Sequence, residues 1–503
     1  MFPFNDTICA PATSVGAGAI SIVRISGAET LVILDRVVRF RKGDAASAHG
    51  YSLKFGTIPD VDDVLVSIFH SPHSYTGEDA AEISCHASPY IVRRILELLV
   101  ESGARMAEPG EFSRRAFVNG KMDLAQAEAI VDVIASSSEA AHRVAMNQLR
   151  GHYSSELRSL RDKLLELTAL MELELDFSEE EVEFADRTQL RELLDGATAH
   201  IRRLADSFHT GNAIRNGVPV AIVGAVNSGK STLLNALVGE ERAIVSDIAG
   251  TTRDTIEEVI TLGGIQFRFI DTAGLRETND EIEKIGVERS LTSIDKADVV
   301  IAVLDGTRDC NELKEVLQTI ERRLSPAQTF IPVVNKTDVE GARMLQGFEV
   351  HGPGLQVSAL QDTGLQGASL RDTGLQGAGM QVPAIRDAGL QGAGMQVPAI
   401  RISALKGLGL DELRDRLVKS QEGRFKATEG TLVTNLRHYQ ALVRALESLQ
   451  AVRLGLDAGI PTDLVSEDLR AAISELNSIF GDASSIDFKS VTDLIFGRFC
   501  IGK

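Results

Sequence analysis

The amino-acid sequence predicts a protein that combines α/β domains with an all-α domain. Residues 1–120 and 216–425 carry short apolar runs separated by amphipathic helical stretches, which is typical of α/β folds. Residues 121–215 and 426–503 show helical spacing alone. The length of 503 residues suits about three domains, each large enough to bury a core.

The composition is that of a globular chain. It is 44% hydrophobic and has no apolar run of about 18 residues, the length needed to span a membrane. The first seven residues lack the basic start and apolar core of a signal peptide. The four cysteines include no CxxC pair, which favours reduced thiols over disulfides or a zinc site. We therefore expect a cytoplasmic protein with no membrane partner.

The formal net charge is −19. A protein that holds nucleic acid mainly by neutralising phosphates carries a basic surface, and the sequence has no long basic run. A nucleic-acid partner would therefore have to be bound locally or with help from another protein.

The first domain is predicted over residues 1–120. Apolar patterning predicts three strands, over residues 19–26, 64–69 and 81–85. Helical spacing predicts two helices, over residues 28–38 and 90–100. Mixed strands and helices in this order indicate an α/β domain.

Helical spacing dominates residues 121–215 and returns over residues 426–503. Each stretch carries two apolar stripes. The C-terminal stretch, roughly 75 residues, is marginal as an independent domain. We therefore expect the two stretches to pack together as one discontinuous helical domain, with residues 216–425 inserted between them.

A low-complexity insertion is predicted at residues 345–401. Within it, residues 372–386 and 387–401 are two fifteen-residue copies that differ only at Thr373 and Ala388. Short repeats can stack as a small solenoid, but large side chains are sparse here, which favours a loose surface insertion. No chemistry is assigned to the repeats.

A glycine-rich turn follows the apolar run at 218–223 and precedes a helical stretch at 232–238, in the pattern GxxxxGK[ST]. This order lets backbone N–H groups surround a diphosphate at a helix N-terminus, where the helix dipole favours negative charge. Lys230 then supplies a positive charge to the outer phosphates, and Ser231 offers a hydroxyl to Mg²⁺. The alternative is a chance glycine turn. The predicted nucleotide contacts are Asn227, Ser228, Gly229, Lys230, Ser231 and Thr232.

Four further stretches follow in the order that a guanine-nucleotide switch requires. Residues 246–252 supply threonines for Mg²⁺ and the γ-phosphate, and residues 271–274 supply an aspartate for Mg²⁺ and a glycine N–H for the γ-phosphate. Residues 335–338 and 403–404 would contact the base. The full set is Ser246, Asp247, Ile248, Ala249, Gly250, Thr251, Thr252, Asp271, Thr272, Ala273, Gly274, Asn335, Lys336, Asp338, Ser403 and Ala404, with Thr252 joining Ser231 as the predicted Mg²⁺ ligands.

Asp338 is predicted to select guanine, because its carboxylate can accept both N1–H and N2–H of the base while Lys336 lies along the ring. Adenine would leave that carboxylate without a partner, at a cost on the order of 1–3 kcal/mol. A second Ser-Ala-Leu run at 358–360 competes with 403–405 for the last base-contact loop. The second run is preferred because a helical stretch follows it at 411–417.

One expected catalytic residue is missing. Leu275 stands where a small regulatory GTPase has its water-positioning glutamine. Other groups must therefore orient water and neutralise charge in the transition state. Glu283 could position water, although by itself it is one acidic residue among several. A monovalent cation such as K⁺ could be surrounded by Asn227, Ser246, Ile248 and Thr251.

Several longer stretches resemble the tRNA modification GTPase MnmE (TrmE) family. They are Val23–Gly27, Tyr75–Asp79, Pro109–Ser113, Lys121–Glu128 and Phe499–Lys503, together with the nucleotide motifs. The resemblance covers the whole chain except the repeats. It implies an N-terminal α/β domain that binds folate and forms a homodimer, a discontinuous helical domain, and an inserted P-loop (Ras-like) G domain.

The resemblance also implies an activity. Such proteins form a heterotetramer with the flavoprotein MnmG (GidA) and add a (carboxymethyl)aminomethyl group to C5 of the tRNA wobble uridine, position 34. The implied one-carbon donor is 5-formyltetrahydrofolate or methylenetetrahydrofolate. The family activates GTP hydrolysis with K⁺ when two G domains meet, and the four predicted cation ligands match its potassium site, as Glu283 matches its catalytic glutamate.

The resemblance assigns roles that the residues alone do not. It places Arg24, Glu82, Lys121 and Lys503 at the folate and makes Cys500 catalytic. Without it, Arg24 on a strand is more often an ion-paired surface arginine, and Cys500 is an ordinary buried thiol.

The sequence departs from the family at three places. Ser246 replaces a threonine but keeps the oxygen. Ala87 lies in His86-Ala-Ser-Pro89 where the family has His-Gly-Gly-Pro near the folate, so a glycine that permits positive φ there would be missed. The repeats precede the last base-contact loop.

Two alternative functions remain open at this point. A ribosome-assembly GTPase of the same superfamily would usually carry basic RNA-binding segments, which the acidic balance opposes. A structural scaffold with a degenerate G domain is opposed by the intact Lys230, Asp271 and Asp338.

Overall fold

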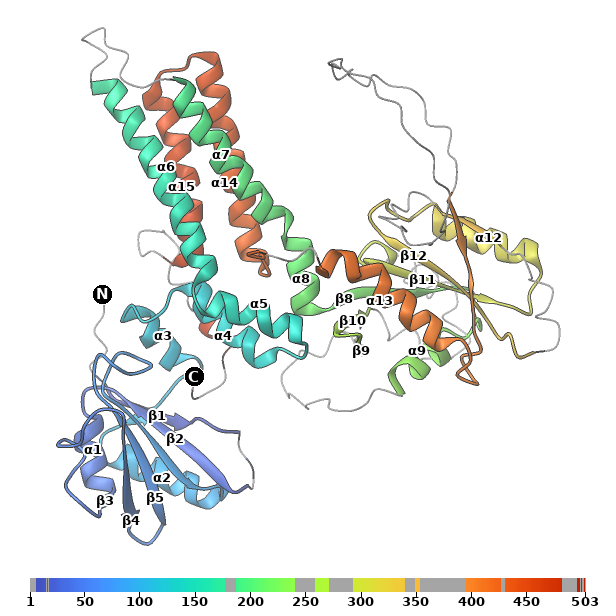
Figure 1. Ribbon diagram of the computed structural model, residues 1–503. Helices are drawn as coiled ribbons and strands as arrows, with labels where there is room; N and C mark the ends of the chain where they lie inside the picture. The colour runs from blue at the N-terminus through green and yellow to red at the C-terminus, as the bar shows by residue number, and fades with distance from the viewer. Residues whose placement is uncertain are drawn as a thin grey trace, which may run out of the picture. The chain divides into compact units, whose positions relative to one another are not determined.

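The computed structural model describes residues 6–14, 16, 18–176, 187–239, 258–270, 293–339, 349–352, 395–426, 430–481, 495–497, 499 and 502. The chain divides into two compact units (Figure 1). The first unit comprises Met1–Arg215 and Gly430–Lys503, and the second comprises Asn216–Glu429. Among the described residues, no helix combines the length and apolar character needed to cross a membrane.

The N-terminal part of the first unit is built on a seven-stranded sheet of order β3-β4-β5-β6-β2-β1-β7. All neighbouring strands are antiparallel except β1 and β7. The strands are β1 (Ile8–Pro11), β2 (Ile20–Ser26), β3 (Arg39–Phe40), β4 (Ser52–Ile58), β5 (Asp62–Phe69), β6 (Ala80–His86) and β7 (Arg105–Met106).

Two helices, α1 (Thr30–Val37) and α2 (Pro89–Glu101), bury their apolar stripes against this sheet. Ile33 and Leu34 of α1 and Ile95 and Leu99 of α2 are at most 1% exposed. The three predicted strands and two predicted helices are confirmed to within two residues at each end. Strand β4 was not predicted, because its outward side chains Leu53 and Phe55 are apolar and hide the alternation.

The rest of the first unit is helical. It contains α3 (Glu111–Val118), α4 (Leu124–Ala135), α5 (Glu139–Leu149), α6 (His152–Asp176), α7 (Arg187–Asp206), α8 (Phe208–Asn216), α14 (Leu436–Ala458) and α15 (Thr462–Phe480). Helix α4 starts at a capping box, in which the Asp123 side chain accepts from Gln126 N and the Gln126 side chain accepts from Asp123 N.

Helices α6, α7, α14 and α15 lie side by side (Figure 1) and share one apolar core. Leu164 of α6, Ile201 of α7, Leu442 of α14 and Leu469 of α15 are all at most 1% exposed within it. The core therefore draws side chains from both the early and the late helical segments of the chain, and each stripe finds an apolar partner.

The second unit contains a six-stranded sheet of order β15-β12-β11-β8-β10-β9. Its strands are parallel except for the β9–β10 hairpin. They are β8 (Val218–Val223), β9 (Glu258–Leu262), β10 (Ile265–Phe269), β11 (Val299–Asp305), β12 (Thr329–Asn335) and β15 (Ile400–Arg401), with helices α9 (Lys230–Gly239), α12 (Cys310–Glu321) and α13 (Leu410–Lys426).

The central strands β8, β11 and β12 read as nearly continuous apolar runs because both faces of the sheet are covered there. All seven residues of β11 are buried. Parallel strands β8, β11 and β12 end at the same edge of the sheet, so the polar residues that follow them meet there.

The predicted insertion at 345–401 is wrong at its C-terminal end. Residues Ile400–Arg401 form β15, which pairs with Val333 and Val334 of β12, and Ile400 is 3% exposed. The last two residues of the second repeat copy therefore form the outermost strand of this sheet. Pairing with β12 buries the apolar side chain of Ile400. Before it, β13 (Glu349–Gly352) and β14 (Met395–Pro398) form an antiparallel pair, and the remaining repeats lie outside the described residues.

Candidate nucleotide site

The segment that runs from the end of β8 into the first turn of α9, residues 224–231, is called the phosphate loop below. Gly224 has φ +155° and Gly229 has φ +96°. A Cβ at Gly224 would collide with the carbonyl oxygen of Val303, and one at Gly229 with the side-chain amide of Asn335. Both glycines are therefore required by conformation and by close approach. Asn227 also adopts positive φ, +62°.

Lys230 is the first residue of α9, and its side chain folds back over the loop. Its Nζ donates to the carbonyl oxygens of Gly224 at 3.0 Å and Ala225 at 2.9 Å. Burial lowers the pKa of Lys230, and the two carbonyl oxygens that accept from its ammonium are neutral. An anion at the helix N-terminus would give this ammonium a charged partner, so the loop suits a phosphate group.

Asn335, the last residue of β12, joins two loops. Its Nδ2 donates to the carbonyl of Ser228 in the phosphate loop at 2.9 Å, and its Oδ1 accepts from Ala404 N at 3.0 Å. Asn335 is 3% exposed and Ser228 is fully buried. One side chain therefore fixes the distance between the phosphate loop and the loop that carries Ser403 and Ala404.

The predicted base-contact residues lie next to this link. A hydrogen bond from Ser403, and then the neighbouring Lys406, hold the pKa of Asp338 below its ordinary value. Lys406 Nζ lies 3.4 Å from Asp338 Oδ2, and the lysine is well exposed. Asp338 is therefore an ionised carboxylate whose partner can move aside for a base. Lys336 has φ +62° and its Nζ lies 2.7 Å from Asp305 Oδ2.

The structure thus brings together eight predicted residues of the phosphate and base loops: Asn227, Ser228, Gly229, Lys230, Asn335, Lys336, Asp338 and Ala404. Ser231 and Thr232 follow on the first turn of α9, and Ser403 is buried beside Asp338. Residues 246–252, 271–274 and Glu283 lie outside the described residues. Of the predicted ligands, only Ser231 for Mg²⁺ and only Asn227 for K⁺ are therefore described.

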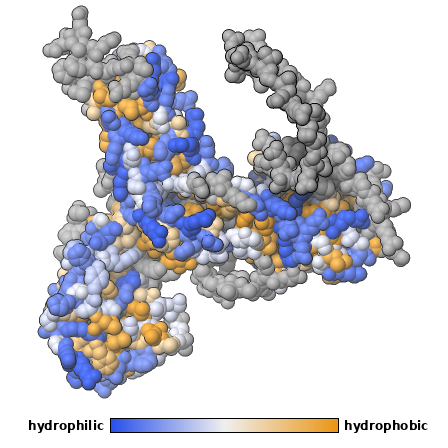
Figure 2. Space-filling model, viewed as in Figure 1, coloured by the Kyte–Doolittle hydropathy of each residue, from blue (hydrophilic) through white to orange (hydrophobic). Residues whose placement is uncertain are grey.

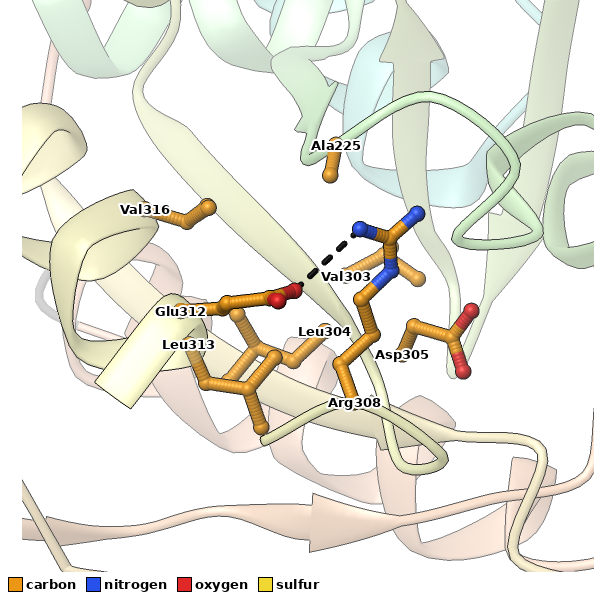
Figure 3. Close-up of a pocket in the computed structure, with 8 residues that line it drawn as sticks. All are labelled: Ala225, Val303, Leu304, Asp305, Arg308, Glu312, Leu313 and Val316. Carbon is orange, nitrogen blue, oxygen red and sulfur yellow. Dashed lines mark hydrogen bonds and ion pairs between the residues drawn. The ribbon is translucent and has the colours of Figure 1, made fainter. Parts of the chain in front are cut away.

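A pocket of about 290 Å³, counted with the solvent at its mouth, lies beside the phosphate loop (Figure 3). It is lined by Ala225, Val303, Leu304, Asp305, Arg308, Glu312, Leu313 and Val316. Of these, only Ala225 belongs to the phosphate loop. The pocket is therefore a neighbour of the candidate phosphate site, on the side of α12, and not the site itself.

The predicted folate residues divide into two groups. Arg24 on β2 faces Glu82 on β6, with Arg24 Nη2 at 2.8 Å from Glu82 Oε1, and its Nη1 donates to the carbonyl of Gly502 at 3.1 Å. The guanidinium carbon lies 5.4 Å from the ring centre of Tyr75 and 5.6 Å from that of Phe112. Lys121 instead donates to the carbonyl of Pro72 at 2.8 Å. Cys500 and Lys503 lie outside the described residues.

Two residues of the nucleotide site were not predicted. Asp305 pairs with Lys336, and Lys406 pairs with Asp338. A signal for Asp305 was available, because it is a lone aspartate at the end of the apolar run 299–304, on a strand next to β12. Lys406 gave no pattern beyond its place after Ser403-Ala-Leu405.

Comparison with protein families identifies both ends of the chain. Residues 7–121 match a model described as the GTP-binding protein TrmE N-terminus, and residues 124–500 match the MnmE helical domain. The second match alone covers more than half of the 503 residues.

Full-length relatives agree. The chain is 44% identical over 505 residues to a protein of Bacteroides thetaiotaomicron named tRNA modification GTPase MnmE, covering 99% of this chain and 100% of the relative. Proteins of the same name from Porphyromonas gingivalis and Flavobacterium johnsoniae are 45% and 44% identical over 511 residues, with 99% of each chain covered.

Solved structures with a partial likeness to this chain all have low TM-scores among those compared. They include the G domain of the FeoB iron transporter of T. maritima (21% identical, TM-score 0.23, 40% of this chain and 97% of that one). A GTP-binding protein of Sulfolobus solfataricus in complex with GDP is 15% identical (TM-score 0.23, 67% and 78% covered). At these TM-scores the likeness carries no weight, and the identification rests on the family models and the full-length relatives: the chain belongs to the MnmE (TrmE) family of tRNA modification GTPases.

Proposed function

We propose that this protein hydrolyses GTP in a Mg²⁺- and K⁺-dependent reaction and uses that cycle in tRNA modification. The observation that carries the first half is the bond pair of Asn335, which ties the phosphate loop to the base loop. Gly224, Gly229 and the start of α9 then suit a diphosphate, and the ionised Asp338 suits the N1–H and N2–H of guanine.

The metal ions fit the residues that are described. Ser231 stands on the first turn of α9 next to the phosphate loop, where its hydroxyl would ligate Mg²⁺ together with Thr252. Asn227, held at positive φ, would ligate K⁺ with Ser246, Ile248 and Thr251, and Glu283 would position water. Mg²⁺ and K⁺ would offset negative charge on the phosphates. Glu283 would take the place of the water-positioning glutamine, where this sequence has Leu275.

The direct test is GTP turnover in KCl against NaCl at equal ionic strength, with and without the flavoprotein partner. We expect turnover in KCl to be severalfold faster, and faster again with the partner. Equal rates in the two salts would remove the cation from the mechanism while leaving GTP binding intact.

For the second half, the family relationship supports addition of a (carboxymethyl)aminomethyl group to C5 of uridine 34 together with MnmG (GidA), in the cytoplasm where tRNA is processed. The relatives carry the name tRNA modification GTPase over their full length. Cys500 is the proposed catalytic thiol. Cys500→Ser should abolish modification, scored on tRNA nucleosides, and spare GTP hydrolysis. Loss of both activities together would indicate a folding role instead.

A folate site is proposed around Arg24. Its guanidinium lies within about 6 Å of two aromatic ring centres and bonds to Glu82 and to the backbone of Gly502, so charged, planar and backbone groups converge there. A 5-formyl- or methylenetetrahydrofolate would supply the one-carbon unit, with Lys121 and Lys503 as further contacts. Arg24→Ala should weaken 5-formyltetrahydrofolate binding at least tenfold in calorimetry, and unchanged binding would place the site elsewhere.

A homodimer through the N-terminal domain is proposed from its sheet. The outer face of β4 and β5 exposes Leu53 (62%), Phe55 (45%) and Leu65 (43%), and Phe55 stands opposite Leu65 in the strand register. Figure 2 shows apolar residues gathered on the near face of this domain. A contiguous exposed apolar patch marks an interaction surface. Phe55→Lys should shift the mass measured by light scattering from dimer to monomer. A dimeric variant would contradict this interface.

In this proposal, residues 1–120 form the folate-binding and dimerisation domain, and residues 121–215 with 426–503 form the helical domain. The G domain then spans 216–425. The two units of the structure, which meet at Arg215/Asn216 and Glu429/Gly430, support these boundaries to within a few residues.

A further inference from the structure

The base-contact lysine of the nucleotide site has a partner that no motif assigns. Lys336 Nζ lies 2.7 Å from Asp305 Oδ2. The two residues come from neighbouring parallel strands, since Asp305 is in register with Asn335 and Lys336 is the next residue along. The backbone also joins them, because Gly306 N donates to the carbonyl of Asn335 at 2.9 Å.

The carboxylate of Asp305 is itself fixed. Its side chain is 7% exposed. Its Oδ1 accepts from Thr307 N at 3.0 Å and from Thr307 Oγ1 at 2.7 Å, which leaves Oδ2 directed at Lys336. Burial alone would raise the pKa of Asp305, but the hydrogen bonds from Lys336 and Thr307 outweigh burial and hold the pKa below its ordinary value. The carboxylate is therefore ionised at neutral pH.

A second cation close to Asp305, the guanidinium of Arg308, pairs with a different carboxylate. Arg308 lies only three residues from Asp305 and lines the same pocket. Figure 3 shows its guanidinium directed toward Ala225 and paired with Glu312, at 3.2 Å, while the Asp305 carboxylate turns away from both. The loop therefore presents two separate ion pairs, and Asp305 serves Lys336.

We propose that Asp305 is a positioning residue for base recognition: it holds the ammonium of Lys336 so that the lysine stem is already extended where it covers a purine ring. This inference rests on the proposed nucleotide site. A lysine side chain that is ordered before binding loses less conformational entropy when the base arrives. Asp305 would therefore affect affinity and not base choice, because the stem packs on the ring face and reads no edge.

The inference separates Asp305 from Asp338 by a measurable pattern. Asp305→Asn preserves volume and shape but removes the charge. We expect it to weaken both GDP and IDP binding by the same factor, about fivefold for a pair whose lysine is still partly exposed, and to leave kcat unchanged while KM for GTP rises. Asp338→Asn should instead change the ratio of GDP to IDP affinity, because inosine lacks the 2-amino group.

The decisive experiment is a double-mutant cycle measured by calorimetric titration of GDP. Lys336→Met keeps an unbranched stem and removes the ammonium. If Asp305 acts through that ammonium, Asp305→Asn has no further effect on GDP affinity in the Lys336→Met background. Glu312→Gln, which breaks the other ion pair of the same pocket, is the matched control and should leave GDP affinity unchanged.

Each result has one meaning. An equal loss of GDP affinity in both backgrounds, or a fall in kcat at constant KM, would overturn the positioning role. If the melting temperature shows that Asp305→Asn is unfolded, Thr307→Val replaces it, because this change removes only the hydroxyl bond to the carboxylate. Thr307→Val must then weaken GDP binding about twofold, and this loss must disappear in the Lys336→Met background. If Asp338→Asn leaves the GDP to IDP ratio unchanged, the base site itself is misassigned and this inference falls with it.

Discussion

Ion pairs serve different ends in the two units. In the first unit, Arg115 is fully buried and bonds to Asp6, Glu78 and Glu111. In the second unit, Lys230 bonds to two backbone carbonyls, and Asp338 pairs with Lys406, a lysine that is 58% exposed. The first arrangement is closed to ligands, whereas the second consists of contacts that a ligand can replace.

A second closed cluster lies among the helices of the first unit. Glu128 on α4 bonds to Arg437 Nε at 3.0 Å and to His438 Nε2 at 2.7 Å, and one turn later Asp132 pairs with Arg215. Arg215 is the last residue before the chain enters the second unit, and Arg437 follows soon after it returns. Helix α4 therefore holds the chain both where it leaves the first unit and where it returns.

The comparison teaches that a charged residue, or one with a shifted pKa, indicates a binding site only where a ligand can replace its partners.

The largest expected effect comes from breaking the closed cluster around Arg115. Arg115→Ala removes a fully buried guanidinium from its three carboxylates. Asp6 and Glu111 keep Arg105 and Glu78 keeps Ser26, but the loss of the buried cation should still lower the free energy of unfolding by about 3–5 kcal/mol in urea titrations. Arg94→Ala, which removes only solvent-screened pairs with Glu97 and Glu101, should leave the free energy of unfolding close to that of the wild type. GDP affinity should be unaffected in both variants. Comparable stability of the two variants would show that burial does not distinguish these clusters.

The second effect is a pH dependence from Glu128. Burial alone would raise the pKa of Glu128, but His438 and Arg437 lower it to about 2. Burial in turn lowers the pKa of His438 itself. Since the folded pKa of Glu128 lies below the unfolded value of 4.5, this stabilisation is complete above pH 4.5 and is lost as the pH falls toward 2.

The shift corresponds to about 3 kcal/mol. Unfolding of the wild type and of Glu128→Gln should therefore differ most above pH 4.5, with the difference shrinking toward pH 2. A difference that is constant with pH would mean that Glu128 stabilises by packing and not by charge. GDP affinity at pH 7 should again be unchanged.

The third prediction concerns the replaceable contacts of the second unit. Asp338→Asn should reduce GTP affinity by about 10- to 100-fold and transfer preference to xanthosine triphosphate. The melting temperature should stay within a degree or two, because Asp338 contributes to no buried cluster. Competition between the two nucleotides measures the switch. Unchanged GTP preference would refute the base-site assignment.

The smallest effect is expected from the repeats. Deleting residues 372–386 removes one whole copy and leaves the second, whose residues 395–401 supply β14 and β15. Shortening the connection between the paired strands β13 and β14 by this much changes closure entropy by well under about 1 kcal/mol. Melting temperature and GTP turnover should match the wild type. A clear loss of either would give the first copy a role that its sequence does not reveal.

The sequence predicted the parts of this structure that depend on local pattern. Strands β2, β5 and β6 and the phosphate loop followed from alternation and glycine spacing, and they lie where expected. Strand β4 escaped because its outward residues are apolar, and β15 was hidden in a repeat whose composition resembles a surface loop.

Contacts between residues far apart in the chain were not predicted, for a different reason. The bond from Asp305 to Lys336 and the clamp of Glu128 on Arg437 join residues that are far apart in the chain. No spacing rule marks such pairs, because their distance is set by strand register and helix packing. The geometry alone separates them from the many other charged residues.

The central claim is that the replaceable contacts of the second unit, and not the closed clusters of the first, receive the nucleotide. Hydrogen exchange of the full chain, followed by mass spectrometry with and without Mg²⁺ and GDP, tests it most directly. We predict slower exchange at residues 224–232, 335–338 and 403–406, with no change over α3 or the start of α14. Equal protection of both sets, or protection of the clusters alone, would contradict this account.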